Sequence, residues 1–368
     1  MSPSIRFPEF TGEWKEERLS EIADIYKGAG ISKDQLSDNG EPCILYGELY
    51  TKYKTETITE VISRTDIDNT KLVRSKANDV IIPCSGETAE DIATARCVIK
   101  DGILLGGDLN IIRLHNYDGS FVSYQLNGKR KYDIAKVAQG VSVVHLYGEH
   151  LKGVKTVNPC LAEQKKISRF LSLLDERIAV QNRLIDRLQS LMIGIAQKIA
   201  HSNKPNVRIS DCLECSSSAL QESEVNKTGK YPVYGANGIV GYIDKYHTQN
   251  EAIYIIKDGS GVGGVSYVTG KCSSTGTLNI LQAKNGHSLK YLYYLLKVFN
   301  FVPYKTGMAI PHIYFKDYGK AKIFCPAYPE QLEYAKLLSS IDGNLRIALD
   351  SLKNFNLQKQ YLLRHMLI

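Results

Sequence analysis

A long apolar seam in the middle of the chain constrains its fold more than any other sequence feature. Ten positions separated by alternating steps of four and three residues begin at Ile167, and nine of them are apolar. This spacing predicts a helix that buries one edge against another helix along its whole length, although a single long core helix is the simpler alternative. The apolar positions are Ile167, Leu171, Leu174, Ile178, Ile185, Leu188, Met192, Ile195 and Ile199, with Gln181 as the polar member.

A second seam follows the first at a constant offset of 167 residues. Gly140, His145 and Pro159 recur upstream of it as Gly307, His312 and Pro326, and Glu163-Gln164 recurs as Glu330-Gln331. A constant offset over about sixty residues indicates an internal duplication, so the chain supplies the partner helix itself. The second seam comprises Tyr334, Leu338, Ile341, Leu345, Ala348, Leu352, Phe355, Leu362 and Met366, with Lys359 as its polar member.

The duplication divides the chain into four segments. Residues 1–158 and 205–326 are predicted to be two α+β domains, each with a mixed, mostly antiparallel sheet and helices. Residues 159–204 and 327–368 are predicted to be two long helices that pair as an antiparallel coiled coil. Short β-branched runs at 80–82 and 253–256 predict strands, and 121–138 and 288–300 favour helix. The expected architecture is therefore a pseudo-two-fold repeat of one plan.

Charge and composition suggest the class of partner. The net charge is +7, with −3 over residues 1–158 and +10 over the rest, which favours an anionic partner for the second half. No apolar run reaches the length of a membrane span, and the first residues lack the apolar core of a signal peptide. The eight cysteines show no framework spacing, as expected for reduced thiols. We therefore expect a cytoplasmic protein without a membrane partner.

Two local motifs suggest other kinds of site. Gly259–Gly264 matches the G-x-G-x-x-G pattern of dinucleotide-binding loops, which would make the chain an enzyme that binds a nucleotide or S-adenosylmethionine. The following residues resemble a strand rather than a helix, however, so a hairpin tip is the favoured interpretation. Cys212 and Cys215 form one C-x-x-C without a second pair nearby, so no metal site is expected. No catalytic group stands out.

Glycine-flanked polar loops occur at matching places in both copies and could contact phosphates and base edges. For His145 and His312, a packing role beside the helix entrance is the favoured alternative. The candidate DNA contacts in the first copy are Lys27, Lys33, Tyr46, Gly47, Ser85, Gly86, Gln139, Ser142 and His145. Those in the second copy are Tyr234, Gly235, Asn237, Lys257, Ser260, Gly261, Lys305 and His312.

Three stretches carry a family resemblance: RFPEFTGEW near the start, PCLAEQKKISRFL at 159–171 and PAYPEQ at 326–331. Together with the duplicated helices, they resemble the specificity (S) subunit of type I restriction-modification systems. The resemblance implies that each α+β domain is a target recognition domain that reads one half of a bipartite site in double-stranded DNA. The helices would act as a ruler between the half-sites.

The same resemblance implies partners and places catalysis outside this chain. Two methyltransferase (M) subunits would dock on the helices, and two restriction/translocase (R) subunits would complete the restriction complex. S-adenosylmethionine, ATP and Mg would belong to those subunits, so this chain would hold no cofactor and would not be an enzyme. A coiled-coil scaffold without DNA specificity is a further alternative.

Overall fold

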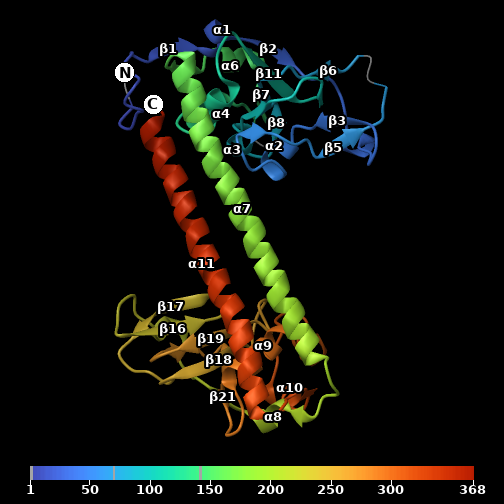
Figure 1. The fold of residues 1–368 in the computed structure, drawn as a ribbon, viewed down its shortest axis with the longest axis vertical. Helices are drawn as coiled ribbons and strands as arrows, with labels where there is room; N and C mark the ends of the chain where they lie inside the picture. Colours follow the sequence, from blue (N-terminus) through green and yellow to red (C-terminus); the bar gives the residue numbers. More distant parts are fainter. Residues whose placement is uncertain (1–2, 69–70, 141–142) are drawn as a thin grey trace. The chain divides into compact units, whose positions relative to one another are not determined.

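A computed structural model of the chain describes residues 3–68, 71–140 and 143–368. The chain divides into two compact units: unit 1 comprises Met1–Asn182 and Ser351–Ile368, and unit 2 comprises Arg183–Asp350. The two long helices are α7 (Leu161–Ala200) and α11 (Tyr328–Met366). Each unit therefore contains one α+β part and a portion of both long helices, α7 and α11, which are labelled in Figure 1.

The main sheet of unit 1 has five strands in the order β2-β11-β7-β9-β4, and all its pairs are antiparallel except β9-β4. The run Val80-Ile81-Ile82 forms the centre of β7 and is fully buried, as expected for a β-branched strand between neighbours. These strands are β2 (Ala23–Lys27), β11 (Leu109–Leu114), β7 (Asp79–Pro83), β9 (Arg96–Val98) and β4 (Thr57–Ile58).

Among its described residues, the α+β part of unit 1 also has three smaller sheets and six short helices. One sheet has four strands in the order β5 (Ser63–Thr65), β3 (Glu41–Ile44), β10 (Leu104–Leu105) and β6 (Val73–Arg74). The other two sheets are strand pairs: β1 (Lys15–Arg18) with β13 (Lys155–Asn158), and β8 (Ser85–Gly86) with β12 (Val144–His145). The helices are α1 (Leu19–Ile22), α2 (Glu48–Thr51), α3 (Ala89–Ile92), α4 (Gly119–Asn127), α5 (Lys131–Val137) and α6 (Gly148–Lys152), with a 3-10 turn at Lys33–Gln35. The segment 121–138 is thus two helices separated by residues 128–130.

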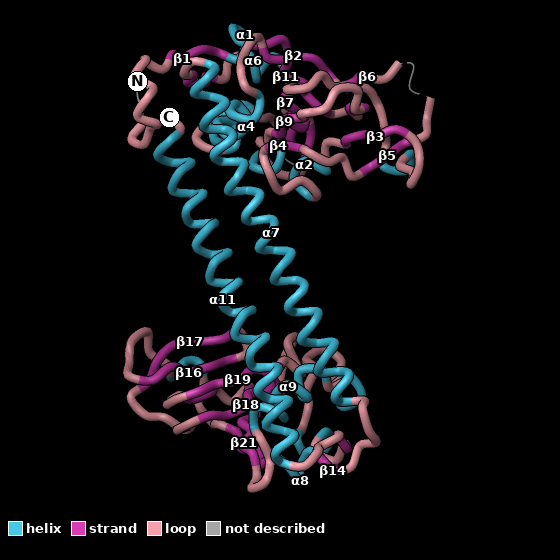
Figure 2. The backbone as a smooth tube through the Cα atoms, viewed as in Figure 1, coloured by secondary structure: helices cyan, strands magenta, loops and turns pink. Residues whose placement is uncertain are grey.

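Unit 2 repeats the plan with less material. Its main sheet is antiparallel, with the order β15 (Leu213–Ser217), β21 (Leu278–Ala283), β18 (Glu251–Ile256) and β19 (Val265–Thr269). A second sheet has the order β17 (Gly238–Ile243), β16 (Tyr231–Gly235) and β20 (Ser273–Ser274). Strands β14 (Val207–Arg208) and β22 (Lys322–Ile323) form a separate pair. The helices are α8 (Ile209–Cys212), α9 (Leu289–Val298) and α10 (Phe315–Tyr318), with 3-10 turns at Glu222–Glu224 and Val302–Tyr304. The α+β class and the repeat are confirmed (Figure 2).

The long helices bury the stripe that the heptad spacing picks out. In unit 1, α7 and α11 pack side by side in the main core, where Ile167 and Leu171 join Leu362 and Met366. In unit 2, Met192 of α7 and Leu345 of α11 line one small cavity beside α9. None of the fourteen seam residues is exposed: Ile167, Leu171, Leu174, Ile178, Ile185, Leu188, Met192, Ile195, Leu338, Ile341, Leu345, Leu352, Phe355 and Leu362 are buried or half-buried. Every helix among the described residues falls short of the length and apolarity that crossing a lipid bilayer requires.

A glutamine at the entrance of each long helix joins that helix to its α+β part. In unit 1, the side chain of Gln164 accepts a hydrogen bond from the Asp118 amide at 2.9 Å and donates to the Pro159 carbonyl at 2.8 Å. In unit 2, Gln331 accepts from the Ser288 amide at 2.8 Å and donates to the Pro326 carbonyl at 2.8 Å. Asp118 and Ser288 cap the following helices α4 and α9. The glutamine of the duplicated Glu-Gln pair thus makes the same two contacts in both units.

Replacing either glutamine by alanine is expected to destabilise only its own unit. Each change leaves a buried amide and a carbonyl without a partner, which costs about 1–3 kcal/mol. The chain has a single tryptophan, Trp14, in the core of unit 1, so its fluorescence during denaturant unfolding reports on that unit. We expect Gln164→Ala to lower the Trp14 midpoint and Gln331→Ala to leave it in place. Equal shifts for both variants would contradict the assignment.

Candidate nucleic-acid interface

In unit 1, several predicted contact loops meet at one edge of the main sheet. Because β11 runs antiparallel to both β2 and β7, its first residues lie beside the last residues of its two neighbours. Lys27 at the end of β2 pairs with Asn110, and its Nζ lies 4.0 Å from Oδ1 of Asp108 in the turn before β11. The amide of Cys84, just after β7, donates to the carbonyl of Asp108.

A hairpin turn closes this edge. The amide and carbonyl of Gln139 pair with the carbonyl and amide of His145 at 2.9 and 2.7 Å. His145 also pairs with Ser85, and the next amide, from Leu146, donates to the Cys84 carbonyl at 2.7 Å. Gly140 has a φ of +122°, where a Cβ atom would collide with the carbonyl of Val143. The predicted contact Ser142 lies outside the described residues.

Unit 2 builds the same edge from equivalent residues. Thr306 and His312 exchange two backbone hydrogen bonds of 2.8 and 2.7 Å, and the Ile313 amide donates to the Lys257 carbonyl at 2.9 Å. Gly307 has a φ of +87° and meets the carbonyl of Ile310 in the same way. The matching glycines and histidines of the repeat thus preserve one hairpin and its attachment to the sheet.

The two histidines hold their hairpins to the sheet edge through their backbones. The ring of His312 also contacts Oδ1 of Asp258 through Nδ1 at 2.7 Å, whereas the residue equivalent to Asp258 in unit 1 is Ser85. Each histidine ring stacks near a tyrosine two residues later, Tyr147 or Tyr314, at centroid distances of 6.2 and 6.5 Å. Both tyrosines are about half exposed, at 55% and 49%. They are absent from the predicted contacts, although the 167-residue offset relates them too.

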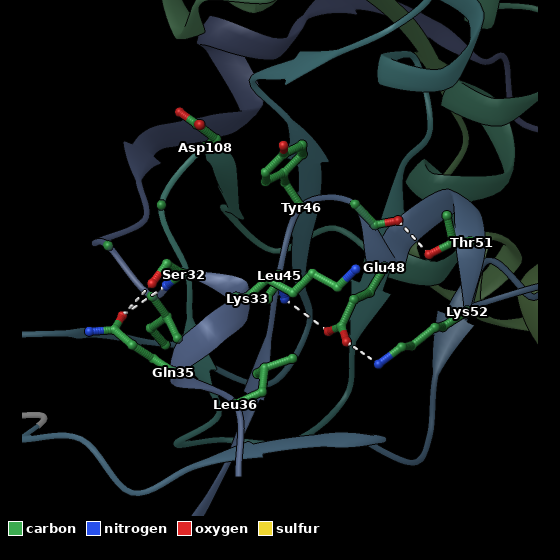
Figure 3. A pocket seen from close by; sticks show the side chains of 14 residues that line it. Ser32, Lys33, Gln35, Leu36, Leu45, Tyr46, Glu48, Thr51, Lys52 and Asp108 are labelled. Carbon is green, nitrogen blue, oxygen red and sulfur yellow. Dashed lines mark hydrogen bonds and ion pairs between the residues drawn. The ribbon is translucent and has the colours of Figure 1, made fainter.

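Three other predicted residues of unit 1 line an open pocket of about 850 Å³, drawn in Figure 3. Lys33, Tyr46 and Gly47 share this pocket with Asp108. At its base, the buried carboxylate of Glu48 accepts from the Leu45 amide at 3.0 Å and from Lys52 Nζ at 2.6 Å. Because Asp108 also lies beside Lys27, the pocket adjoins the loops of the sheet edge.

The remaining predicted residues of unit 2 lie in or beside three turns. Gly259–Gly264 joins β18 to β19, which pair antiparallel, so the glycine-rich motif forms a hairpin and no helix begins at its last glycine. Ser260 and Gly261 are exposed at its tip, and Lys257 at its base contacts Ser217 Oγ at 3.4 Å. The other residues are Lys305 after the turn at Val302–Tyr304, Tyr234 and Gly235 at the end of β16, and Asn237 in the β16-β17 turn.

Burial separates accessible candidates from supporting ones. Ser85 and Gly86 are buried, and a Cβ on Gly86 would collide with Ile92, so this pair shapes the edge from beneath. Burial raises the pKa of Tyr234 and raises that of Cys84 to about 11, so both stay neutral near pH 7. The exposed candidates are Lys27, Lys33, Gln139, His145, Asn237, Ser260, Gly261 and Lys305, and this set of amides, hydroxyls and cations suits an anionic, hydrogen-bonding ligand.

The chain matches one protein-family model and is similar in sequence to several known proteins. The family model described as type I restriction modification DNA specificity domain matches residues 11–190 and 202–354. A putative type I restriction enzyme specificity subunit from Haemophilus influenzae is 25% identical over 123 residues, which are 33% of this chain and 32% of that protein. The type I restriction enzyme MjaVIII specificity subunit from Methanocaldococcus jannaschii is 24% identical over 196 residues, 53% of this chain and 43% of that protein. The chain thus matches less than half the length of these curated relatives.

Solved structures share the fold. The S subunit of a type I restriction-modification system from M. genitalium superposes with a TM-score of 0.73 at 18% identity, over 100% of this chain and 99% of that one. A chain from a structural study of complex assembly in a type I system has a TM-score of 0.54 at 14% identity, with 96% and 97% covered.

Proposed function

The chain belongs to the family of type I restriction-modification DNA specificity domains, and from that premise we propose that it is the non-catalytic DNA specificity subunit of such a complex. Unit 1 would read one half of a bipartite target in double-stranded DNA, and unit 2 would read the other. One observation carries the proposal: the same sheet edge, with its hairpin, histidine and exposed tyrosine, is built twice from sequences that otherwise differ.

The two sheet edges share their backbone geometry but differ in their side chains, which suits two units that recognise different DNA sequences. The hairpins are held by main-chain bonds, so the residues at their tips and in neighbouring loops vary without loss of the edge. Lys27 in unit 1 corresponds to Ser217 in unit 2, and Ser85 corresponds to Asp258. Lysine and tyrosine side chains would contact phosphates and fix the register of each unit on the duplex, while the differing polar groups would discriminate bases.

We further propose that the long helices bind the partner subunits. Two exposed apolar positions recur at the 167-residue offset: Phe170 and Leu337, exposed by 38% and 49%, and Val180 and Ile347, exposed by 54% and 66%. Matching apolar surfaces on two equivalent helices suit two copies of one partner, here the methyltransferase (M) subunits. Two restriction/translocase (R) subunits would join the same assembly in the cytoplasm. S-adenosylmethionine, ATP and Mg would bind to those partners, and this chain would hold none of these three cofactors.

Methylome sequencing tests the proposed function. Co-expression of the chain with its methyltransferase partner in a host that lacks both should create one methylated adenine motif made of two half-sites with a fixed gap. Expression of the methyltransferase alone should not. A methyltransferase that modifies the same motif without this chain would refute the proposal.

The exposed tyrosines offer a prediction for each half-site separately. Tyr314→Ala should weaken binding through unit 2 by about fivefold, the equivalent of one hydrogen bond of about 1 kcal/mol. Fluorescence anisotropy would compare the methyltransferase complex on duplexes in which only one half-site matches the motif. Tyr147→Ala is the matched control and should affect the opposite half-site. Loss of affinity for both half-sites in either variant would argue against independent reading.

A further inference from the structure

Three side chains with metal-binding chemistry converge in unit 2, at the place where α11 begins. Among the described residues, one sulfur each from Cys212 and Cys325 and one ring nitrogen from His287 lie within 4.8 Å of one another. Cys212 ends α8, His287 precedes α9 by two residues, and Cys325 follows β22 just before α11. The cluster therefore draws three separate segments together.

The cluster is largely closed to solvent and one of its groups lacks a partner. Cys212 and Cys325 are 0% and 8% exposed. Nδ1 of His287 is buried and has no hydrogen-bond partner within the described part of the chain. A buried nitrogen left without a partner is costly, and a bound cation would remove that cost. The sulfurs of Cys212 and Cys325 lie within 4.8 Å of each other, so both can reach one ion.

The repeat provides an internal comparison for this place. The residues of unit 1 that correspond to Cys212, His287 and Cys325 are Ile22, Tyr117 and Asn158. There Tyr117 and Asn158 both donate to the carboxylate of Glu17, at 2.9 and 3.0 Å. In unit 2 the residue at the place of Glu17 is valine, Val207, so that carboxylate is missing.

Unit 2 thus has two thiols and an imidazole at the positions where unit 1 has an apolar residue and two hydrogen-bond donors. Two thiolates and an imidazole are the ligands that Zn²⁺ prefers, with Zn–S distances of about 2.3 Å. Tetrahedral coordination at that distance places two sulfurs about 3.8 Å apart. The observed limit of 4.8 Å therefore requires the three groups to approach by no more than about 1 Å. We propose that Cys212, His287 and Cys325 form a Zn²⁺ site that fastens the start of α11 to unit 2, with water as the fourth ligand.

The C-x-x-C motif in the sequence pairs Cys212 with another residue, Cys215. Cys215, the other member of the C-x-x-C, lies on β15, and burial raises the pKa of its thiol to about 11. Its sulfur contacts the Ser216 carbonyl. The partners of Cys212 lie 75 and 113 residues away in the chain, a separation that no local spacing rule describes. Cys215 is consequently the matched control for Cys212.

Metal analysis of the full-length chain tests the site. Protein purified under reducing conditions and equilibrated with micromolar free Zn²⁺ should carry one zinc per chain, and Co²⁺ in its place should give thiolate-to-metal absorption bands. Cys212→Ser and His287→Ala should each lower the zinc content at least tenfold, and Cys215→Ser should retain it. Zinc should raise the Tm of the wild-type chain by on the order of 5 °C and leave the Tm of Cys212→Ser unchanged.

Several results would overturn the proposal. The proposal is wrong if the wild-type protein binds no zinc at this concentration. It is also wrong if Cys212→Ser and Cys215→Ser lose zinc equally. A Cys212–Cys325 disulfide found by mass spectrometry in protein kept under reducing conditions would show that the thiols form a redox pair instead. If Cys212→Ser does not fold, circular dichroism will reveal it, and His287→Gln then serves as the second variant because it leaves both thiols in place.

Discussion

Replacing Lys359 by methionine is expected to lower the stability of unit 1 by about 3 kcal/mol, a large effect for one side chain on a helix. Lys359 interrupts the apolar seam of α11, and its Nζ lies 2.7 Å from Oδ1 of Asp175 on α7 and 2.8 Å from Oε2 of Glu56. The side chains of the three residues are 16%, 7% and 10% exposed, respectively. The hydroxyl of Tyr124 donates to the second oxygen of Asp175 at 2.6 Å.

The size of the effect follows from what the variant leaves behind. Methionine removes the only cation that contacts the two carboxylates in the described structure, and an uncompensated buried charge costs more than the pair itself contributed. Burial already raises the pKa of Asp175, against the opposing attraction of Lys359. Without the lysine, Asp175 would take up a proton more readily, which limits the loss to the lower part of the usual range of about 3–5 kcal/mol.

The repeat suggests the compensating change. The residue equivalent to Lys359 in the first seam is Met192, which is 5% exposed in unit 2, so methionine fits a seam position of this kind. The triple variant Lys359→Met, Asp175→Asn and Glu56→Gln removes all three charges and should recover most of the lost stability. Denaturant unfolding followed by Trp14 fluorescence measures the effect in unit 1. A Lys359→Met midpoint equal to wild type would refute the account, and Lys353→Met, at an exposed position, is the control.

Lys359 also shows where sequence reasoning stops. The heptad pattern identified the polar interruption and left two roles for it, fixing the helix register or meeting a partner subunit. The structure gives Lys359 two buried carboxylates within its own unit. The contact with Asp175 follows from the pairing of the helices, but Glu56 lies 303 residues away in a loop with no counterpart in the repeat pattern. Such a partner depends on how the α+β part packs against the helices, which periodicity does not encode.

The candidate interface shows the same difference between features that local spacing predicts and features that depend on packing. Duplication and β-branched runs predicted the fold class, the strands at 80–82 and 253–256 and both long helices, because these depend on local spacing. Composition and place in the repeat predict the loops but do not predict which of their residues are accessible. The predicted contacts therefore include the buried Ser85 and Gly86 and omit the exposed Tyr147 and Tyr314. Accessibility is a property of packing. The repeat offset could have found the tyrosines, since a solvent-exposed aromatic residue kept in both copies has no packing reason to persist.

Lengthening both long helices is the second prediction with a large expected effect, because it should change which DNA is recognised. Four residues of helix-forming sequence would be inserted after Gln181 in α7 and after Ala348 in α11, which are equivalent positions in the repeat. Insertion into both helices keeps the opposing seams equal in length. Four residues add about 6 Å to a helix, and base pairs rise by about 3.4 Å, so we expect the gap between the half-sites to grow by about two base pairs.

Methylome sequencing of the lengthened variant, co-expressed with the methyltransferase, would measure the gap and both half-sites together. The two half-site sequences should stay the same because the edges proposed to read them lie in the α+β parts, and the insertions lie in the long helices. Four residues inserted after Asn203, in the exposed connection that follows α7, are the matched control and should leave the gap as it is. An altered half-site, or an unaltered gap in a folded and active variant, would show that the helices do not set the spacing. Because the edges proposed to read DNA and the helices proposed to set the gap occupy different segments of the chain, we expect each to be changeable without the other.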